Sequence, residues 1–135
     1  MATASLLSVP IGDNFAVLGL LDRGIPARSL ASLADALKIS VPGLATAVRI
    51  PKRTLERRLA SNAKLEVGEA ERAVRLARLF ALAKDVFEDR DEAAAWFHEP
   101  LAVLGGRTPL ELSGTEPGAR EVEQTLGRIE HGVFA

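Results

Sequence analysis

Apolar residues recur along this chain at the spacing of amphipathic helices. The clearest case is residues 29–38, where the apolar positions follow the order i, i+3, i+4 and i+7: Leu30, Leu33, Ala34 and Leu37. Such spacing places one apolar stripe along one side of a helix. The same reading predicts further helices at 14–23, 41–48, 52–60, 66–89, 92–97 and 117–130. No two segments alternate like paired strands, so we predict an all-α fold.

Capping and breaking residues mark the ends of these helices. We expect N-caps at Asp13, Ser29, Ser40 and Asp91. Their side-chain oxygens can accept the backbone N–H groups left free in a first helical turn. Residues 101–109 contain a Gly-Gly pair and a proline, which predict a short turn and a structured loop. Residues 1–12 show no periodicity, and we read them as irregular.

Composition narrows the class of protein. There are no cysteines among the 135 residues, which excludes disulfides, thiol catalysis and cysteine-based metal sites. The longest apolar run, from Phe15 to Leu21, is far shorter than the ~20 residues that cross a bilayer. No Lys or Arg precedes Arg23, so the charged start of a signal peptide is missing. We therefore expect a soluble cytoplasmic protein that does not associate with a membrane.

The formal net charge of −1 hides a strong polarity along the chain. Residues 1–84 carry 13 basic and 7 acidic side chains, a net charge of +6. Residues 85–135 carry 4 basic and 11 acidic side chains, a net charge of −7. One interpretation is that the two halves bind different partners and that the basic half binds a polyanion. The other is that the opposite charges attract each other within the fold.

The segment 44–59, LATAVRIPKRTLERRL, carries the pattern of a helix-turn-helix. Two short helices are separated by a three-residue turn, with Arg49 at the turn position where glycine is commoner. Ala45 is small enough for a close helix crossing, and Ile50 and Leu55 supply apolar anchors. Thr54 falls near the start of the second helix, where a recognition helix meets base edges.

Basic residues surround that position. We predict DNA contacts from Arg49, Lys52, Arg53, Thr54, Arg57 and Arg58. Lys and Arg neutralise backbone phosphates, and Arg also reads guanine in the major groove. The alternative is that these arginines pair with acidic residues on a solvated helical hairpin: Glu56, Glu66, Glu69 and Glu71.

The C-terminal part resembles the toxin-binding domain of the Xre/MbcA/ParS antitoxins. The resemblance rests on residues in a particular order: Trp96, Pro100, Leu104-Gly105-Gly106, Thr108-Pro109, the Thr115–Gly118 turn, Val122, Leu126-Gly127-Arg128-Ile129 and Gly132. Upstream, Arg53-Thr54-Leu55 with Arg57-Arg58, and Leu65 before the long helix, resemble the Xre-type DNA-binding part of that family. The similarity covers about residues 25–134, and it departs at Phe97 and at Ala102-Val103, which affects the choice of toxin.

The resemblance divides the chain into four parts. Residues 1–24 form an N-terminal extension with one helix, 25–65 an Xre-like helix-turn-helix, 66–90 a connecting long helix, and 91–135 a toxin-binding domain. It implies an antitoxin of a type II toxin–antitoxin system. Such a protein blocks a RES-domain toxin that depletes NAD⁺ and, with its toxin, binds operator DNA to repress its own operon.

The resemblance also directs attention to a set of toxin-binding candidates: Leu104, Gly105, Gly106, Arg107, Arg128, His131, Gly132 and Phe134. The glycines allow close approach by a partner or only make a tight turn. Arg128 either reaches the toxin or pairs with acids of its own helix, and His131 either reaches the toxin or complements the helix dipole. Trp96 is better explained as core. We expect the terminal segment 128–135 to help occlude the toxin.

Nothing in the chain indicates catalysis. The two histidines, His98 and His131, lie 33 residues apart and lack a metal-ligand spacing. The acidic run from Asp85 to Glu92 does not match a calcium loop. We therefore expect no enzyme activity, no metal and no cofactor.

Two alternatives to an antitoxin stay open. One is a stand-alone helix-turn-helix regulator whose C-terminal part only dimerises or senses a ligand. The other is an interaction module with a vestigial DNA-binding part. Helix-turn-helix proteins usually place two recognition helices one DNA turn apart, so we also expect a homodimer. The long helix at 66–89 is a candidate for its interface.

Overall fold

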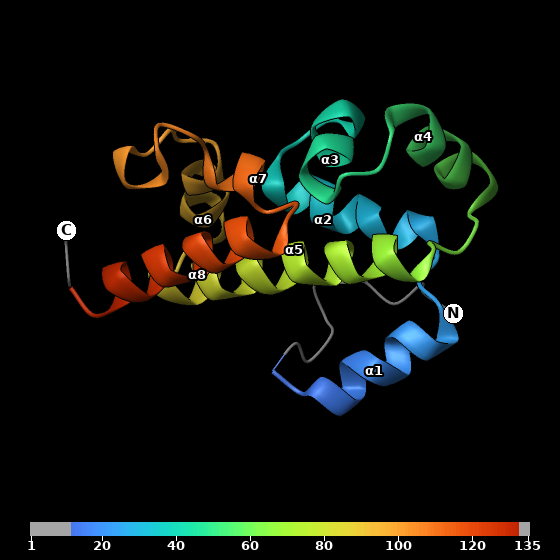
Figure 1. The fold of residues 1–135 in the computed structure, drawn as a ribbon, viewed down its shortest axis with the longest axis horizontal. Helices are drawn as coiled ribbons and strands as arrows, with labels where there is room; N and C mark the ends of the chain where they lie inside the picture. Colours follow the sequence, from blue (N-terminus) through green and yellow to red (C-terminus); the bar gives the residue numbers. More distant parts are fainter. Residues whose placement is uncertain (1–11, 133–135) are drawn as a thin grey trace.

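One long helix, α5 (Val67–Phe87), runs through the middle of the structure, and the other helices pack around it (Figure 1). The computed structural model describes residues 12–132. Three helices cover one side of the N-terminal half of α5: α2 (Leu30–Leu37), α3 (Val41–Val48) and α4 (Lys52–Ser61). The helix α1 (Asn14–Arg23) lies on another side and packs against α5 through half-buried apolar residues.

The C-terminal part uses the other half of α5. It consists of α6 (Arg90–Phe97), α7 (Pro109–Leu112) and α8 (Glu116–Glu130), and α8 lies alongside α5 (Figure 1). Short 3₁₀ turns occur at Ala27–Ser29 and Ala102–Leu104. Residues 12–132 contain no strand, only isolated bridges such as Leu101 with Arg107. The predicted all-α class is confirmed.

The core is a continuous cluster in which α5 contributes to both halves. Ala73, Leu76 and Leu79 have exposed fractions of 0% and face the surrounding helices. At the C-terminal half, Phe80 and Trp96 each pack against Phe97, with ring centroids 6.2 and 5.4 Å away. Trp96 also contacts Phe87 at 5.8 Å. This aromatic packing confirms Trp96 as a core residue.

The helices near the N-terminus end in an unusual way. α2, α3 and α4 each finish at a residue other than glycine with a left-handed backbone, Lys38, Arg49 and Asn62, at φ values of 56°, 53° and 51°. The N–H of such a residue bonds back to carbonyls of the last turn, while the final carbonyl groups of the helix still need partners from outside it.

Side chains from elsewhere in the fold supply those partners. Arg28 Nε and Nη2 donate to the carbonyls of Leu59 and Ala60 at the end of α4, both at 3.0 Å. At the end of α2, His98 Nε2 lies 2.7 Å from the Leu37 carbonyl oxygen, to which it donates in its Nε2-protonated form. A cation or donor at a helix C-terminus also offsets the negative end of the helix dipole.

Two predictions about helix ends need correction, and one short helix was not predicted. The N-cap of α6 is Asp89, not Asp91, because the Asp89 carboxylate accepts the Asp91 N–H at 2.8 Å. Ser29 precedes α2 but makes no cap hydrogen bond, since the chain already turns helically from Ala27. The loop at 101–109 leads directly into α7, a short helix that Thr108 and Glu111 open with a reciprocal capping box.

The other predicted caps hold. The Asp13 carboxylate accepts from the N–H groups of Phe15 and Ala16, and Ser40 caps α3 through Gly43. No single helix of residues 12–132 is long and apolar enough to cross a membrane. The segments 27–37 and 41–48 reach that length and apolarity only together, across a bend of 106°.

Candidate functional site

The two helices α3 and α4 form the predicted helix-turn-helix. The turn at 49–51 begins with Arg49 in the left-handed conformation that a glycine usually supplies. Ile50 and Leu55 are buried at 2% and 0% exposure, and Ala45 is buried at 6%. These anchors fix α4 against α3, so the apolar side of α4 is fully used in packing.

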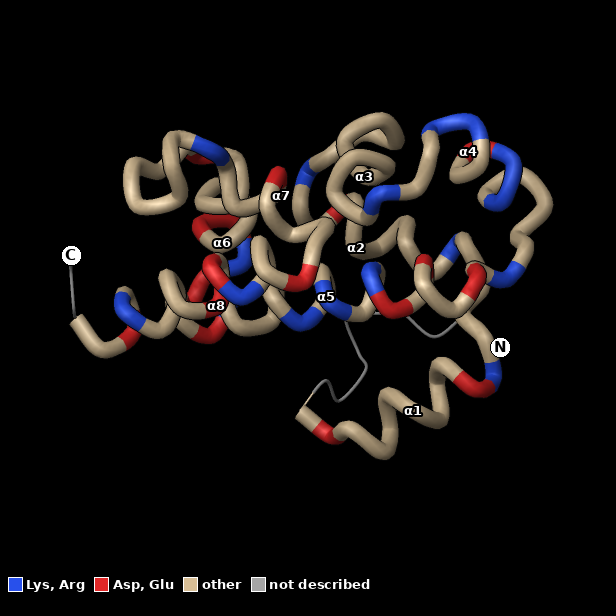
Figure 2. The backbone as a smooth tube through the Cα atoms, viewed as in Figure 1, with Lys and Arg blue, Asp and Glu red and all other residues tan. Residues whose placement is uncertain are grey.

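Three basic side chains point outward from α4. Lys52, Arg53 and Arg57 are exposed, and none forms an ion pair with a described residue. Arg53 and Arg57 are four residues apart, so they share one helix face, about opposite the buried Leu55. Figure 2 shows this basic run along α4 at one extremity of the molecule. We call the exposed residues Lys52, Arg53 and Arg57 the basic face of α4.

Arg58 does not belong to that face. Its side chain is 17% exposed, and its Nε lies 3.0 Å from Oε1 of Glu69, whose side chain is 9% exposed. Its Nη2 donates to Glu69 Oε2 at 3.2 Å and to Glu66 Oε1 at 3.4 Å. The guanidinium therefore ties α4 to the first turn of α5. For Arg58 the structure contains the intramolecular pairing considered from the sequence, which argues against the predicted DNA contact.

Two further DNA-binding candidates, Arg49 and Thr54, belong neither to the basic face of α4 nor to an ion pair among the described residues. Arg49 is exposed at the turn, but its aliphatic stem lies against Gly114 of the C-terminal part. Thr54 is half-buried on α4, beside the basic face. Both positions stay predictions as DNA contacts.

One residue that positions the turn was missed by sequence reasoning. Arg72 of α5 donates from Nε to the Val48 carbonyl at 2.6 Å and from Nη2 to the Arg49 carbonyl at 3.3 Å. It thereby caps α3 and holds the helix-turn-helix turn against α5. The only local signal is the predicted end of α3 at Val48, whose free carbonyls need a donor.

The loop before α7 brings the predicted glycines together at the surface. Gly105 and Gly106 have φ values of 70° and 81°, and both are exposed. Left-handed backbone explains why glycine stands at both positions, so the tight-turn reading is supported. Their Cα atoms face open space, since no atom lies within 4 Å of where a Cβ would stand. The backbone there is accessible to a partner.

Other residues of this loop divide between surface and interior. Arg107 is exposed, and its backbone pairs with Leu101 to close the loop. Leu104 is buried at 7% exposure, so its side chain anchors the loop, which argues against a direct toxin contact by that side chain. Val103, 48% exposed, is the large apolar side chain that the loop leaves in solvent.

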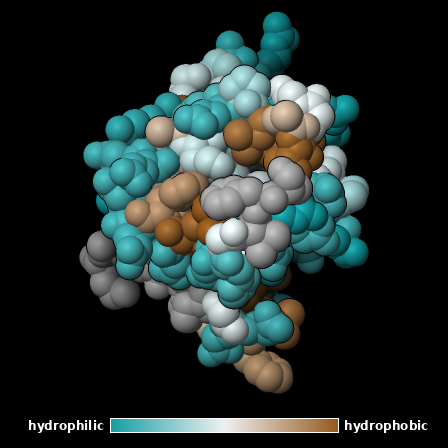
Figure 3. All heavy atoms as spheres, turned by 90° about the vertical axis from the view of Figure 1, so that its left-hand side faces the viewer, coloured by the Kyte–Doolittle hydropathy of each residue, from teal (hydrophilic) through white to brown (hydrophobic). Residues whose placement is uncertain are grey.

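The end of α8 presents the remaining toxin-binding candidates. Arg128 is exposed and, within residues 12–132, it pairs with none of the acids considered for it. His131 caps α8, with Nε2 3.9 Å from Glu130 Oε1, and Gly132 follows at φ 70°. Phe134 lies outside the described residues. Figure 3 views the end of the molecule that carries this segment and the glycine loop, and hydrophobic patches lie there among hydrophilic atoms.

The described residues hold no cluster of three or more His, Asp or Glu side chains that fits a metal ion. The arrangement has two surfaces on one helical body, a basic face on α4 and a glycine loop with the α8 end on the C-terminal part. The fold and these surfaces define a helix-turn-helix protein with a second helical region that shares its long central helix.

Comparisons with known proteins identify both regions. Residues 16–78 match the antitoxin Xre-like helix-turn-helix domain, and residues 82–132 match the antitoxin Xre/MbcA/ParS C-terminal toxin-binding domain. Antitoxin Xre of Yersinia enterocolitica is 35% identical over 129 residues, covering 83% of this chain and 87% of that protein. Antitoxin Xre of Photorhabdus laumondii is 31% identical, covering 86% and 79%. The Prs ADP-ribosylating antitoxin of a Sphingobium species is 28% identical, covering 87% and 80%.

The chain belongs to the Xre family of antitoxins. The resemblance read from Trp96, the Gly-Gly loop and the end of α8 is thereby confirmed at the level of the family. The match boundary between residues 78 and 82 falls inside α5. A single continuous helix therefore carries the end of the DNA-binding part and the start of the toxin-binding part.

Proposed function

We propose that this protein neutralises a RES-domain toxin that degrades NAD⁺ and represses its own operon through operator DNA. It acts in the cytoplasm as a homodimer and is not itself an enzyme. One observation supports this proposal above all. The same chain carries a region that matches the Xre-like helix-turn-helix domain and a region that matches the toxin-binding domain, and the basic face of α4 in the first region forms no ion pair with a described residue.

DNA binding is assigned to the basic face of α4. Lys52, Arg53 and Arg57 carry three positive charges that no described carboxylate neutralises. Phosphate contacts made by such residues release counterions and give binding its salt dependence. Arg53 and Arg57 extend from the side of α4 opposite its buried anchor, which suits entry of the helix into a major groove.

Toxin binding is assigned to the glycine loop and the α8 end. Gly105 and Gly106 offer exposed backbone, while Arg107 and Arg128 offer exposed guanidinium groups that form no ion pair with residues 12–132. His131 and Gly132 lead into the last residues, which are small enough to enter a cleft. We propose that residues 128–135 reach the entrance of the toxin's active site and block it.

The neighbouring gene product is the natural test partner. We expect co-expression to yield a co-purifying complex and to preserve cellular NAD⁺, which the neighbour alone should deplete. A chain truncated after Glu130 should still bind DNA but protect NAD⁺ less well. A matched control is Arg120→Ala, because Arg120 is exposed on α8 and pairs only with Glu116 of its own helix. Full protection by the truncated chain removes the tail from the mechanism.

A second candidate toxin chemistry comes from the name of the Sphingobium relative, a Prs ADP-ribosylating antitoxin. If the partner of the present chain transfers ADP-ribose, NAD⁺ is consumed together with covalent modification of a protein. Mass spectrometry of Prs, the protein named in that relative's description, distinguishes ADP-ribose transfer from NAD⁺ hydrolysis when it is done on the co-expressing cells. An added mass of one ADP-ribose favours transfer, whereas NAD⁺ loss without it favours hydrolysis. The stand-alone regulator is favoured instead if the chain binds upstream DNA and no neighbouring protein.

A further inference from the structure

A groove of about 300 Å³ lies between α5 and the C-terminal half of α8. Its apolar lining comes from Leu82, Val86 and Leu126, with Gly127 opening the side of α8. Three carboxylates stand at the groove: Asp85, Glu123 and Glu130. Among the described residues, the ion-pair contact recorded for these three carboxylates is that of Glu130 Oε1 with His131 Nε2, at 3.9 Å. The groove therefore has an apolar floor and an acidic rim.

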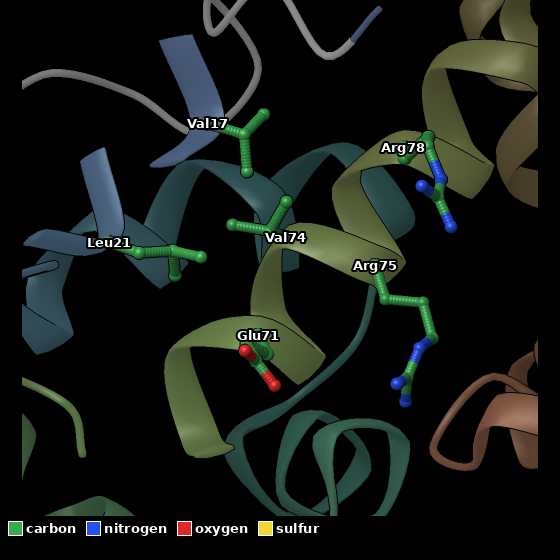
Figure 4. Close-up of a pocket in the computed structure, with 6 residues that line it drawn as sticks. All are labelled: Val17, Leu21, Glu71, Val74, Arg75 and Arg78. Carbon is green, nitrogen blue, oxygen red and sulfur yellow. The ribbon is translucent and has the colours of Figure 1, made fainter. Parts of the chain in front are cut away.

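The same face of α5 is basic one to two turns earlier. Arg75 and Arg78 border a second hollow, between α5 and α1, together with Glu71 and Val74. Figure 4 shows Val17 and Leu21 of α1 directed at Val74, while the two guanidinium groups extend away from α1. Neither arginine forms an ion pair with a residue in 12–132.

These charges cannot meet within one copy of α5. Arg78 and Asp85 are seven residues apart, about 10 Å along the axis, while pairs three or four residues apart are neighbours on a helix. Their positions, with Leu82 between them, nevertheless fall on one stripe of the helix surface. The stripe therefore reads basic, apolar, acidic from its N-terminal to its C-terminal end.

We propose that this stripe is the interface with a second copy of the chain, paired antiparallel about a two-fold axis near Leu82. Between Arg78 and Asp85 an antiparallel partner reads acidic, apolar, basic along the same line, so these two charges each meet an opposite charge. Arg78 of one copy then faces Asp85 of the other. The two Leu82 side chains meet at the centre. Because a two-fold interface uses the same patch twice, the self-complementary charge order is what it requires.

The pairing leaves two of the assigned surfaces free. The basic face of α4 and the loop at Gly105-Gly106 belong to other elements than the stripe. A dimer formed in this way can hold two basic faces and two glycine loops at once. The inference rests on the homodimer of the proposed function and gives it a location.

A cysteine variant tests the central contact directly, because the natural chain has no cysteine. We expect Leu82→Cys to form a covalent dimer under mild oxidation, since the two β-carbons meet at the axis. Ala31→Cys, exposed on α2, is the control and should cross-link at least about tenfold more slowly. Equal rates for the two variants would overturn the proposal.

Charge reversal tests the polar contacts in the toxin-free protein by light scattering on a sizing column. Arg78→Glu and Asp85→Arg should each raise the Kd of dimerisation by about tenfold or more. Combining them restores attraction and should recover the dimer. Glu121→Arg, exposed on another side of α8, should leave the Kd unchanged. A monomeric wild type, or a dimer indifferent to Arg78→Glu, would refute the interface.

The co-expression assay distinguishes failure of the proposed dimer interface from failure of the proposed toxin neutralisation. A monomeric Arg78→Glu variant that still protects NAD⁺ leaves toxin binding intact and supports the interface. If the wild type dimerises through α5 but protects against no neighbouring toxin, the proposed function fails and the interface stands.

Discussion

Gly114 lies directly against Arg49, so a Cβ on Gly114 would stand 2.7 Å from Arg49 Cγ. The same Cβ would be 3.0 Å from the carbonyl oxygen of Ala47. Gly114 is buried between α7 and α8, and Arg49 opens the turn between α3 and α4. The toxin-binding part therefore touches the helix-turn-helix at its turn, in addition to sharing α5 with it.

Substituting Gly114 should disturb both parts of the molecule. We expect Gly114→Val to cost about 1–3 kcal/mol of unfolding free energy, because the added atoms overpack a buried contact. Arg49 must also move, so operator affinity should fall further than the loss of folded protein explains. Urea unfolding and DNA titration measure the two effects. DNA affinity unchanged for the folded variant would show that the contact does not influence the turn.

Gly118, at the start of α8, should be still less tolerant. A Cβ there would stand 2.1 Å from the Leu112 carbonyl oxygen, a contact that requires the backbone to shift. We expect Gly118→Ala to lower the melting temperature by several degrees, equivalent to about 1–3 kcal/mol. The matched control is Gly127→Ala on the same helix, where no atom lies within 4 Å. That change should stabilise α8 by about 0.5–1 kcal/mol through helix preference.

Arg72 should matter for the shape of the turn as well as for stability. Replacing it by Gln removes the donors that reach the carbonyls of Val48 and Arg49. We expect a loss of about 1–3 kcal/mol, the usual contribution of hydrogen bonds from a charged group, one of which is part-buried here. Lys84→Gln, an exposed change on the same helix, should cost at most about 0.5 kcal/mol. Equal losses in urea unfolding would mean that Arg72 does not hold the turn.

The sequence predicts most of the helices because each is long enough to show its periodicity. Local chemistry also identifies the turn at Arg49 and the anchors Ile50 and Leu55, both buried as expected. The helix α7 was not predicted because its four residues span little more than one helical turn and show no periodicity. Its capping box, Thr108 with Glu111, is the one signal in the sequence that could have revealed it.

The assignment of individual arginines depends on packing that the sequence does not contain. Arg57 and Arg58 are neighbours with the same local chemistry, yet one is exposed and the other is paired with Glu69. Arg58 stands three residues after the buried Leu55 and so faces the packed side of α4, but its partner Glu69 comes from α5 and is not local to it. Arg72 donates hydrogen bonds to the carbonyls of Val48 and Arg49, which lie 24 and 23 residues earlier in the chain, so no local sequence pattern predicts this role.

The contrast between Arg57 and Arg58 is itself testable. Arg58→Ala removes the cation that pairs with Glu69, whose side chain is only 9% exposed. We expect it to cost about 1–3 kcal/mol of unfolding free energy, while Arg57→Ala changes stability by less than about 0.5 kcal/mol. DNA binding should respond in the opposite order, with Arg57→Ala the more damaging once the folded fraction is equal. A reversed order in either assay would contradict the assignment of Arg58 to the interior.

The basic face of α4 makes a quantitative prediction about salt. Arg53 and Arg57 share one outward face and have no acidic partner among the described residues, so each is free to neutralise a phosphate. Each phosphate contact contributes about 0.9 to the slope of log affinity against log salt concentration. We therefore expect the Arg53→Ala, Arg57→Ala double variant to bind a promoter fragment more weakly and to flatten that slope by about 1.8. Titrations at several salt concentrations measure it. Glu56→Gln is the control, because it removes the one acidic side chain of α4 and should strengthen binding without lowering the slope. A double variant with the wild-type slope would move DNA binding away from this face.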